Sequence, residues 1–268
     1  MKNKKVMSLY LAVSVLTALV VSGCSNTADS EKAEQKNSTD VSVEENTENV
    51  DEASAEESSE SEETSEDKEA EAQQLLMDLT GSYEELWPVI LADEYQEQWV
   101  SDCAELVGKE NAQASYEKLI SMVTGTIYGE EAAKAYADGS GVYDCDFLQG
   151  VAELEFDGDT SEIRGYDKDG KELFSHTYHF VGMEEMRGMY EYESDDADSG
   201  EFTYFCIAPD TSDTTYHIEL RYGSDLDALG EYAEGAYAYW MASGISTDYD
   251  EEMVKNCIQL FCTENLSE

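Results

Sequence analysis

Residues of three metal-binding types occur together between positions 205 and 223. His217 is one of 3 histidines in the sequence, and Glu219 stands two positions after it, with Cys206 eleven positions before it. Imidazole nitrogen, thiolate sulfur and carboxylate oxygen are the ligands that zinc takes in proteins. The stretch is therefore either part of a metal site or an ordinary strand pair whose His217 and Glu219 are solvated or hydrogen-bonded to each other.

Alternation with period two predicts how the side chains of 214–222 point. The expected core face carries Tyr216, Ile218, Leu220 and Tyr222. The opposite face then carries Thr215, His217, Glu219 and Arg221. On this face His217 and Glu219 could chelate one ion together, because residues i and i+2 of a strand share a face. A neighbouring strand could add Cys206 or His179 as a further ligand.

The other two histidines fall on opposite faces of another expected strand. His176 shares the apolar face of Phe174 and Tyr178, so we expect a hydrogen-bonded core histidine there rather than a ligand. His179 points the other way and could share a polar face with His217. Which residues of neighbouring strands lie side by side does not follow from the sequence.

Other sites of chemistry are weakly indicated. Asp157, Asp159, Asp167 and Asp169 lack the spacing of a calcium-binding EF-hand loop, and hairpin turns account for them. The acidic loop 193–201 is expected to attract cations without binding them specifically. We find no nucleophile elbow, no zinc-protease helix motif and no phosphate-binding glycine loop, so we do not expect an enzyme.

The start of the chain predicts export and lipid anchoring. Lys2, Lys4 and Lys5 precede an uncharged apolar run, 6–21, that is short for a span of about 20 residues. The following Val21-Ser22-Gly23-Cys24 is typical of a bacterial lipoprotein signal. We therefore expect residues 1–23 to be a signal peptide, and Cys24 to hold the protein at the cell membrane on its extracytoplasmic face.

Two compositional regions follow the expected anchor. Residues 24–72 are rich in serine, threonine and glutamate and contain no aromatic residue, which predicts a disordered acidic tether. Residues 73–268 are long enough for one domain with a hydrophobic core. The net charge of −47 makes nucleic acid or an anionic membrane surface a poor partner, because phosphates would be repelled.

The periodicity of the domain changes from helical to strand-like along the chain. Apolar residues at three-and-four spacing predict helices over 73–138. Strands are expected around 152–156 and 174–180, and further strands at 188–193, 201–207 and 214–222. Two helices should follow, one capped by Ser224 and running through 240, the other over 248–265. This order predicts an α+β, mainly antiparallel β fold: a calycin- or lipocalin-like barrel with N-terminal and C-terminal helices.

Four motifs in this order resemble the ZinT-like zinc-binding domain. They are LTGSYEELWPVI at 79–90, YDKDGKELFSHTYHFVG at 166–182, IAPDTSDTTYHIELRYG at 207–223 and YAYWMASGISTDYDEEMV at 237–254. The resemblance implies a lipocalin-like barrel with a three-histidine zinc site near its mouth. It places the three ligands at Phe205, Thr215 and His217, so one histidine of three remains.

Two interpretations of function follow. The first is an extracytoplasmic lipoprotein that binds zinc or another divalent metal, or delivers it to a metal transporter, through a degraded site around His217. The alternative is a non-metal binding module whose barrel mouth takes a small ligand or a protein partner. The aromatic residues Tyr237, Tyr239 and Trp240 could serve such a mouth, although an aromatic stripe at this spacing is more often core packing.

The number of cysteines limits how many disulfide bonds the chain can form. Apart from Cys24, the chain carries Cys103, Cys145, Cys206, Cys257 and Cys262. An odd number allows at most two disulfides within the chain, and buried free cysteines are an open alternative. Cys257 and Cys262 are five positions apart on one expected helix and point in different directions, so they should not pair with each other.

Overall fold

The structure is a computed structural model that describes residues 65–267 except 124–126, 140–142, 185–186 and 210–216. The expected signal peptide, Cys24, most of the expected tether and Thr215 lie outside the described residues. No helix among the described residues is long and apolar enough to cross a membrane.

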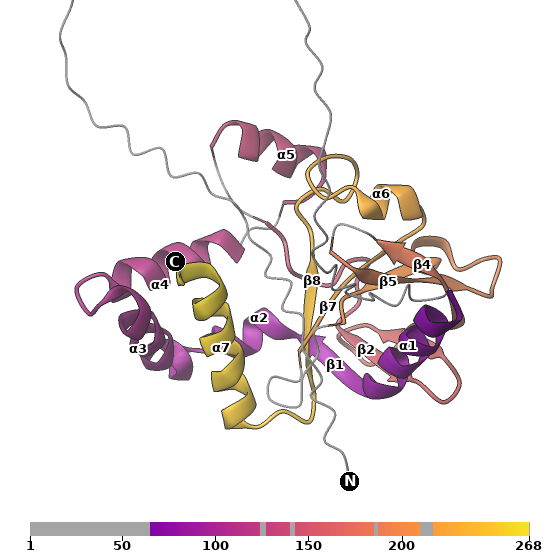
Figure 1. The fold of residues 1–268 in the computed structure, drawn as a ribbon, viewed down its shortest axis with the longest axis horizontal. Coiled ribbons are helices and arrows are strands. Elements are labelled where there is room, and N and C mark those ends of the chain that lie inside the picture. The colour runs from indigo at the N-terminus through magenta and orange to yellow at the C-terminus, as the bar shows by residue number, and fades with distance from the viewer. Residues whose placement is uncertain (1–64, 124–126, 140–142, 185–186, 210–216, 268) are drawn as a thin grey trace, which may run out of the picture. The chain divides into compact units, whose positions relative to one another are not determined.

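Eight antiparallel strands form a closed barrel in chain order, and β1 pairs with β8 to close it (Figure 1). The strands are β1 Gly81–Glu85, β2 Glu153–Asp157, β3 Glu162–Tyr166, β4 Glu172–Glu184, β5 Met189–Ser194, β6 Tyr204–Ile207, β7 His217–Gly223 and β8 Ala242–Ser246. This confirms the predicted calycin-like antiparallel barrel. Closure leaves no unpaired sheet edge, which removes the usual site of edge-to-edge association.

The barrel interior is filled mainly by aromatic rings. Phe205 lies 5.2 Å from Tyr178 and 5.2 Å from Tyr222, measured between ring centroids, and Phe174 stacks on Phe202 at 3.9 Å. Trp240 meets Tyr222 edge-on at 5.2 Å. These rings belong to one buried cluster that fills the space between the strands. The interior is thus a packed core.

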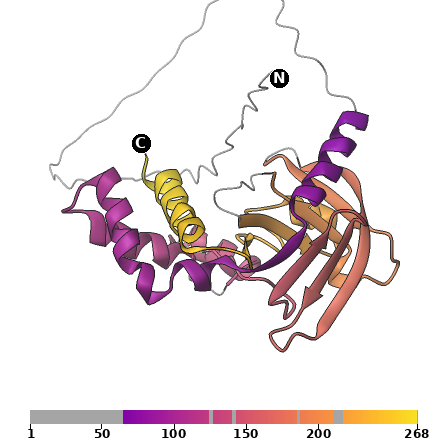
Figure 2. The same ribbon diagram turned by 90° about the horizontal axis from the view of Figure 1, so that it is seen from below.

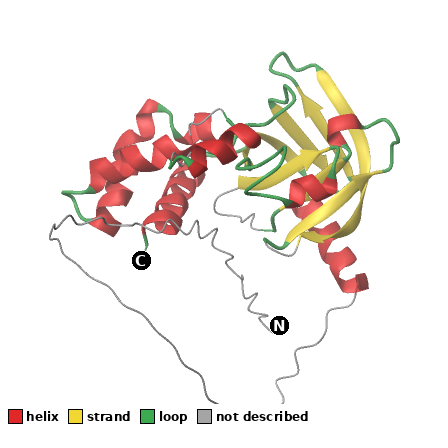
Figure 3. Cartoon of the chain, turned by 90° about the horizontal axis from the view of Figure 1, so that it is seen from above, coloured by secondary structure: helices red, strands yellow, loops and turns green. Residues whose placement is uncertain are grey.

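A second hydrophobic cluster lies outside the barrel wall, among helices that gather on one side of the barrel (Figures 1 and 3). The helices are α2 Leu86–Ile90, α3 Gln96–Val107, α4 Ala112–Val123 and α7 Glu251–Leu266. Trp87 and Trp99 both meet Phe261 of α7, at 4.8 and 5.8 Å between ring centroids. Ile245 of β8 belongs to this cluster, so the outer face of the barrel wall is buried here.

The prediction that 73–138 is helical throughout is wrong at Gly81–Glu85. Residues 81–85 form β1, which pairs with β2 on one side and β8 on the other. Tyr83 of this strand enters the barrel core, where Phe156 meets its ring edge-on. Pairing with two strands far along the chain overrides the local helical pattern, because strand preference depends on packing and neighbours.

Helix α1, Ser65–Asp78, begins inside the segment that we expected to be tether. It packs against the barrel in Figure 2, and the hydroxyl of Tyr192 donates to the carbonyl of Ala72 at 2.8 Å. Gly158 allows this close approach, since a Cβ there would lie 2.3 Å from the Cα of Met77. The folded domain therefore begins before residue 73, because the apolar residues of the helix bury against β-strand side chains.

The helix expected to start at Ser224 is short. Asp225 is the N-cap of α6, Leu226–Gly230, and accepts a hydrogen bond from the backbone of Ala228. The chain leaves the helix after Gly230, and Tyr239 has a positive φ of 56°. The rest of the expected helix is irregular because its residues cover the end of the barrel instead. Helix α5, Glu130–Ala137, lies next to this stretch, with Tyr136 stacked on Tyr239 at 3.7 Å.

A candidate site between the barrel wall and helix α7

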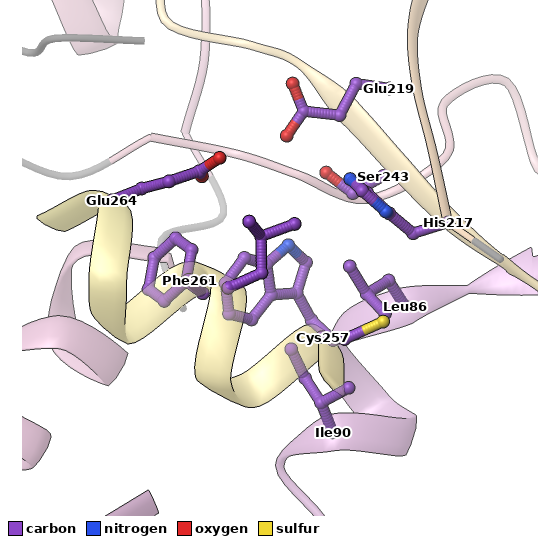
Figure 4. A pocket seen from close by; sticks show the side chains of 10 residues that line it. Leu86, Ile90, His217, Glu219, Ser243, Cys257, Phe261 and Glu264 are labelled. Carbon is purple, nitrogen blue, oxygen red and sulfur yellow. The ribbon is translucent and has the colours of Figure 1, made fainter. Parts of the chain in front are cut away.

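A small pocket separates the outer face of β7 and β8 from α2 and α7 (Figure 4). His217 and Glu219 of β7 line it from the barrel side, and Phe261 and Glu264 line it from α7. Its free volume is about 30 Å³. That is room for a water molecule or an ion rather than for an organic ligand, whose sites usually exceed about 300 Å³.

Strand register places His217 and Glu219 on the outer face, as the alternation predicted. Ile218 and Leu220 point into the barrel core, so the residues between them point outward. His217 lies opposite Ile245 and Glu219 opposite Ser243 on β8. His217 is only 7% exposed, so the interpretation that it is solvated is wrong. The helices that cover it come from distant parts of the sequence.

Helix α7 supplies the opposite wall through four residues that share one face. Leu260 and Phe261 each lie three or four positions from Cys257 and from Glu264, which places all four along one side of a helix. The carboxylate of Asp250 caps the helix by accepting from the backbone of Met253 at 2.9 Å. Glu264, Ser243 and Cys257 were not predicted as site residues. Only the spacing to Phe261, which was expected to point inward, could have indicated Glu264.

Buried thiols near the pocket are held in the protonated form. Burial raises the pKa of the Cys257 thiol to about 12. Burial also raises the pKa of Cys145 well above its usual range, and the negative charge of Glu219 adds to this shift. The thiolate is the form that binds metal, so neither cysteine is a ready ligand at neutral pH. The ligands that could bind a metal here without deprotonating a buried thiol are imidazole nitrogen and carboxylate oxygen.

The structure does not bring Cys206 to His217. Cys206 of β6 lies opposite Arg221, which is four residues further along β7. Burial raises the pKa of Cys206 to about 12. Arg221 is fully buried, and its guanidinium donates to the carbonyls of Leu229, Glu231 and Tyr237. Cys206 therefore belongs to a different part of the outer face.

His179 is also remote from the pocket. It lies on β4, and β5 and β6 separate that strand from β7. Its Nδ1 is hydrogen-bonded at 2.8 Å to the carboxylate of Asp195 near the protein surface. The Nδ1 of His176 is hydrogen-bonded at 2.8 Å to the carboxylate of Asp196, as expected, but this side chain is half-buried rather than part of the core. Neither side chain can join His217 without a change of fold.

The position that the family resemblance assigned to a ligand, Phe205, lies inside the barrel. It is opposite Tyr222 in the ladder, and its side chain is completely buried among aromatic rings. His217 faces outward, so the barrel wall separates the two side chains. Among the residues that the structure describes, no group of three or more histidine, cysteine, aspartate or glutamate side chains could hold a metal ion.

Two further expectations concern turns and aromatics. The carboxylate of Asp167 accepts from the backbone of Asp169 and Lys171, and these bonds lower its pKa, which confirms a hairpin turn at this position. Tyr237 and Trp240 are buried in the barrel cluster and Tyr239 is half-buried. Core packing thus explains Tyr237 and Trp240, and the filled interior gives the ligand-binding alternative no support.

The fold is thus a calycin-like barrel with flanking helices. The chain was compared with protein families, curated proteins and solved structures. No protein-family profile and no curated protein matches the chain. The chain is similar to the Zn(II)-bound ZinT-like domain of Streptococcus pneumoniae AdcA, at 16% identity and a TM-score of 0.42, covering 70% of this chain and 89% of that one. It is also similar to Zn(II)-bound AdcA from Streptococcus pneumoniae, at 16% identity and a TM-score of 0.39, covering 70% of this chain. It spans 35% of that longer protein. The first of these structures is a ZinT-like domain, the family that the sequence motifs resemble.

Proposed function

We propose that this protein is an extracytoplasmic lipoprotein whose ZinT-like barrel binds zinc or a similar divalent metal weakly, for capture or for delivery to a metal transporter. The observation that carries the proposal is the placement of His217 and Glu219 side by side on β7, in a pocket of ionic size. Imidazole and carboxylate are both ligands of Zn²⁺. The four sequence motifs and their order along the chain support the ZinT-like assignment.

The described residues supply an incomplete set of ligands. His217 and Glu219 can give two, and Glu264 faces the same pocket from α7. Zinc sites in proteins normally have three or four protein ligands, so water would have to fill the remaining positions. We therefore expect an affinity far below that of a three-histidine site. Weak binding suits a protein that passes its metal on.

Calorimetric titration of the full chain with Zn²⁺ tests the metal-binding part of the proposal. The expected result is weak, saturable binding that His217→Ala abolishes and Glu219→Gln weakens. His179→Ala is the matched control, because that histidine pairs with Asp195 outside the pocket and should leave binding unchanged. Binding that is equal in His217→Ala and the unmodified chain would reject this site and indicate diffuse attraction by the acidic surface.

The anchoring part of the proposal has an independent test. Cys24 follows Val21-Ser22-Gly23 at the end of an apolar run, as in lipoprotein signals. Cys24→Ala should abolish the incorporation of labelled fatty acid and change processing of the chain. Ser25→Ala is the matched control and should still be acylated. Continued labelling of Cys24→Ala would contradict the assignment.

A further inference from the structure

Two cysteines from distant parts of the chain meet in the helical cluster. Cys103 of α3 and Cys262 of α7 are 159 positions apart, yet their Sγ atoms are 3.8 Å from each other. Both side chains are completely buried. Neither lines the pocket around His217, so this pair is a separate feature of the molecule.

Neighbouring contacts hold the two thiols in place. Helices α3 and α7 lie side by side in Figure 1 and are in direct contact. Trp99, one turn before Cys103, meets Phe261, the residue before Cys262, with ring centroids 5.8 Å apart. The indole of Trp99 also donates to the carbonyl of Ile90 at 2.7 Å. The two sulfur atoms therefore lie close together within the packed helical cluster.

A disulfide bond would need only a local movement. Its length is about 2.05 Å, so the two sulfur atoms would have to approach by less than about 2 Å. Rotation of two cysteine side chains covers such a distance when the helices already lie in contact. All five cysteines of the described residues are buried and unbridged in the structure, so Cys103 and Cys262 are present there as two thiols.

We propose that Cys103 and Cys262 form a disulfide when the chain meets an organic disulfide, such as oxidised glutathione or the active-site disulfide of a thiol oxidoreductase. One protein thiolate attacks a sulfur of the organic disulfide, whose S–S bond breaks and releases one thiol. The second protein thiolate then attacks the first protein sulfur and releases the second thiol. The two protein thiols are oxidised, the organic disulfide is reduced to two thiols, and the two protons pass to the leaving sulfurs.

Burial decides when the exchange takes place. It raises the pKa of both Cys103 and Cys262, so the reactive thiolate is scarce in the folded protein. The bond should therefore form while the helices are docking, or during local opening of α3 from α7. Once formed, it joins residues far apart in the sequence and restricts the unfolded chain, which stabilises the native fold. It would also fix α7, which forms one wall of the pocket.

Peptide mapping of the full chain tests the proposal. The chain is refolded with oxidised and reduced glutathione, free thiols are blocked, and the protein is cut with trypsin without reduction. We expect a linked pair of peptides, 69–109 and 256–268, that separates on reduction. Cys257→Ala should keep the link and Cys262→Ala should lose it, which distinguishes the two cysteines of the second peptide. Blocked thiols at both 103 and 262 in the unmodified chain would overturn the proposal.

A stability measurement supplies a second readout. The oxidised chain should unfold at a higher temperature than the reduced chain, and this difference should vanish in Cys103→Ala. Cys206→Ala is the control, because Cys206 lies on β6 opposite Arg221, away from the helical cluster, and it should retain the difference. A link that persists in Cys262→Ala, or equal transitions for oxidised and reduced chains, would contradict the role assigned to this pair.

Discussion

The inner and outer faces of β7 are buried by different means. On the inner face, Ile218, Leu220 and Tyr222 pack against other strands of the same barrel. On the outer face, His217 and Arg221 are also buried, but by other segments: α2 and α7 lie over His217, and residues 229–237, which follow β7, cover Arg221. Apolar side chains fill one face, whereas polar side chains with specific partners occupy the other.

This difference shows where function can arise on a closed barrel. The side chains of the inner face fill the barrel interior at close-packed density, so no space is left there for a ligand. The outer face can hold polar groups because the covering segments bring carbonyls and carboxylates to them. Three backbone carbonyls accept from Arg221, and the pocket leaves room for an ion beside His217.

The largest expected effect comes from placing a histidine on the inner face. Phe205→His should lower the free energy of unfolding by about 3 kcal/mol or more, because it removes aromatic packing and buries a polar ring. It should add no zinc affinity, since the barrel wall lies between positions 205 and 217. Chemical denaturation and zinc calorimetry measure the two effects. Phe205→Leu is the control and should lose less stability. A gain in zinc affinity would mean that the faces assigned to these strands are wrong.

A smaller effect is expected from Arg221 on the outer face. Arg221→Met keeps much of the side-chain volume but leaves three backbone carbonyls, two of them in buried hydrogen bonds, without their donor. We expect a loss of about 1–3 kcal/mol, offset in part because burial disfavours the charge and lowers the pKa of Arg221 to about 10. Denaturant titration measures the change. Increased stability of Arg221→Met would show that desolvation of the charge outweighs its hydrogen bonds.

The smallest effect concerns the acidic groups near the end of β1. Burial raises the pKa of Glu85, Asp144 and Asp146. With raised pKa values the folded state binds more protons than the unfolded state, so stability falls as the pH rises from the unfolded pKa, about 4, through the raised values. The melting temperature should therefore be higher in mildly acidic buffer than at pH 7. Glu85→Gln should reduce this dependence, and Glu84→Gln, at the neighbouring position of β1, is the matched control. A melting temperature that rises steadily up to pH 7 would contradict the prediction.

The sequence by itself determined the barrel and the two faces of β7. Alternation with period two requires only that one face of a strand is buried, so Ile218 and Leu220 were assigned inward and His217 and Glu219 outward without knowledge of any partner. The same reasoning failed at Gly81–Glu85, where local periodicity suggested a helix but pairing with β2 and β8 made a strand.

Only the tertiary structure decided what meets the outer face. The sequence allowed Cys206 or His179 to join His217, but strand order and register place Cys206 opposite Arg221 and separate β4 from β7 by two strands. The position of Glu264 in the pocket and the contact between Cys103 and Cys262 both depend on where α7 packs. Local patterns fix which way a side chain points. Its partners depend on contacts between separate segments, such as Cys103 and Cys262 at 159 positions apart, which no local pattern records.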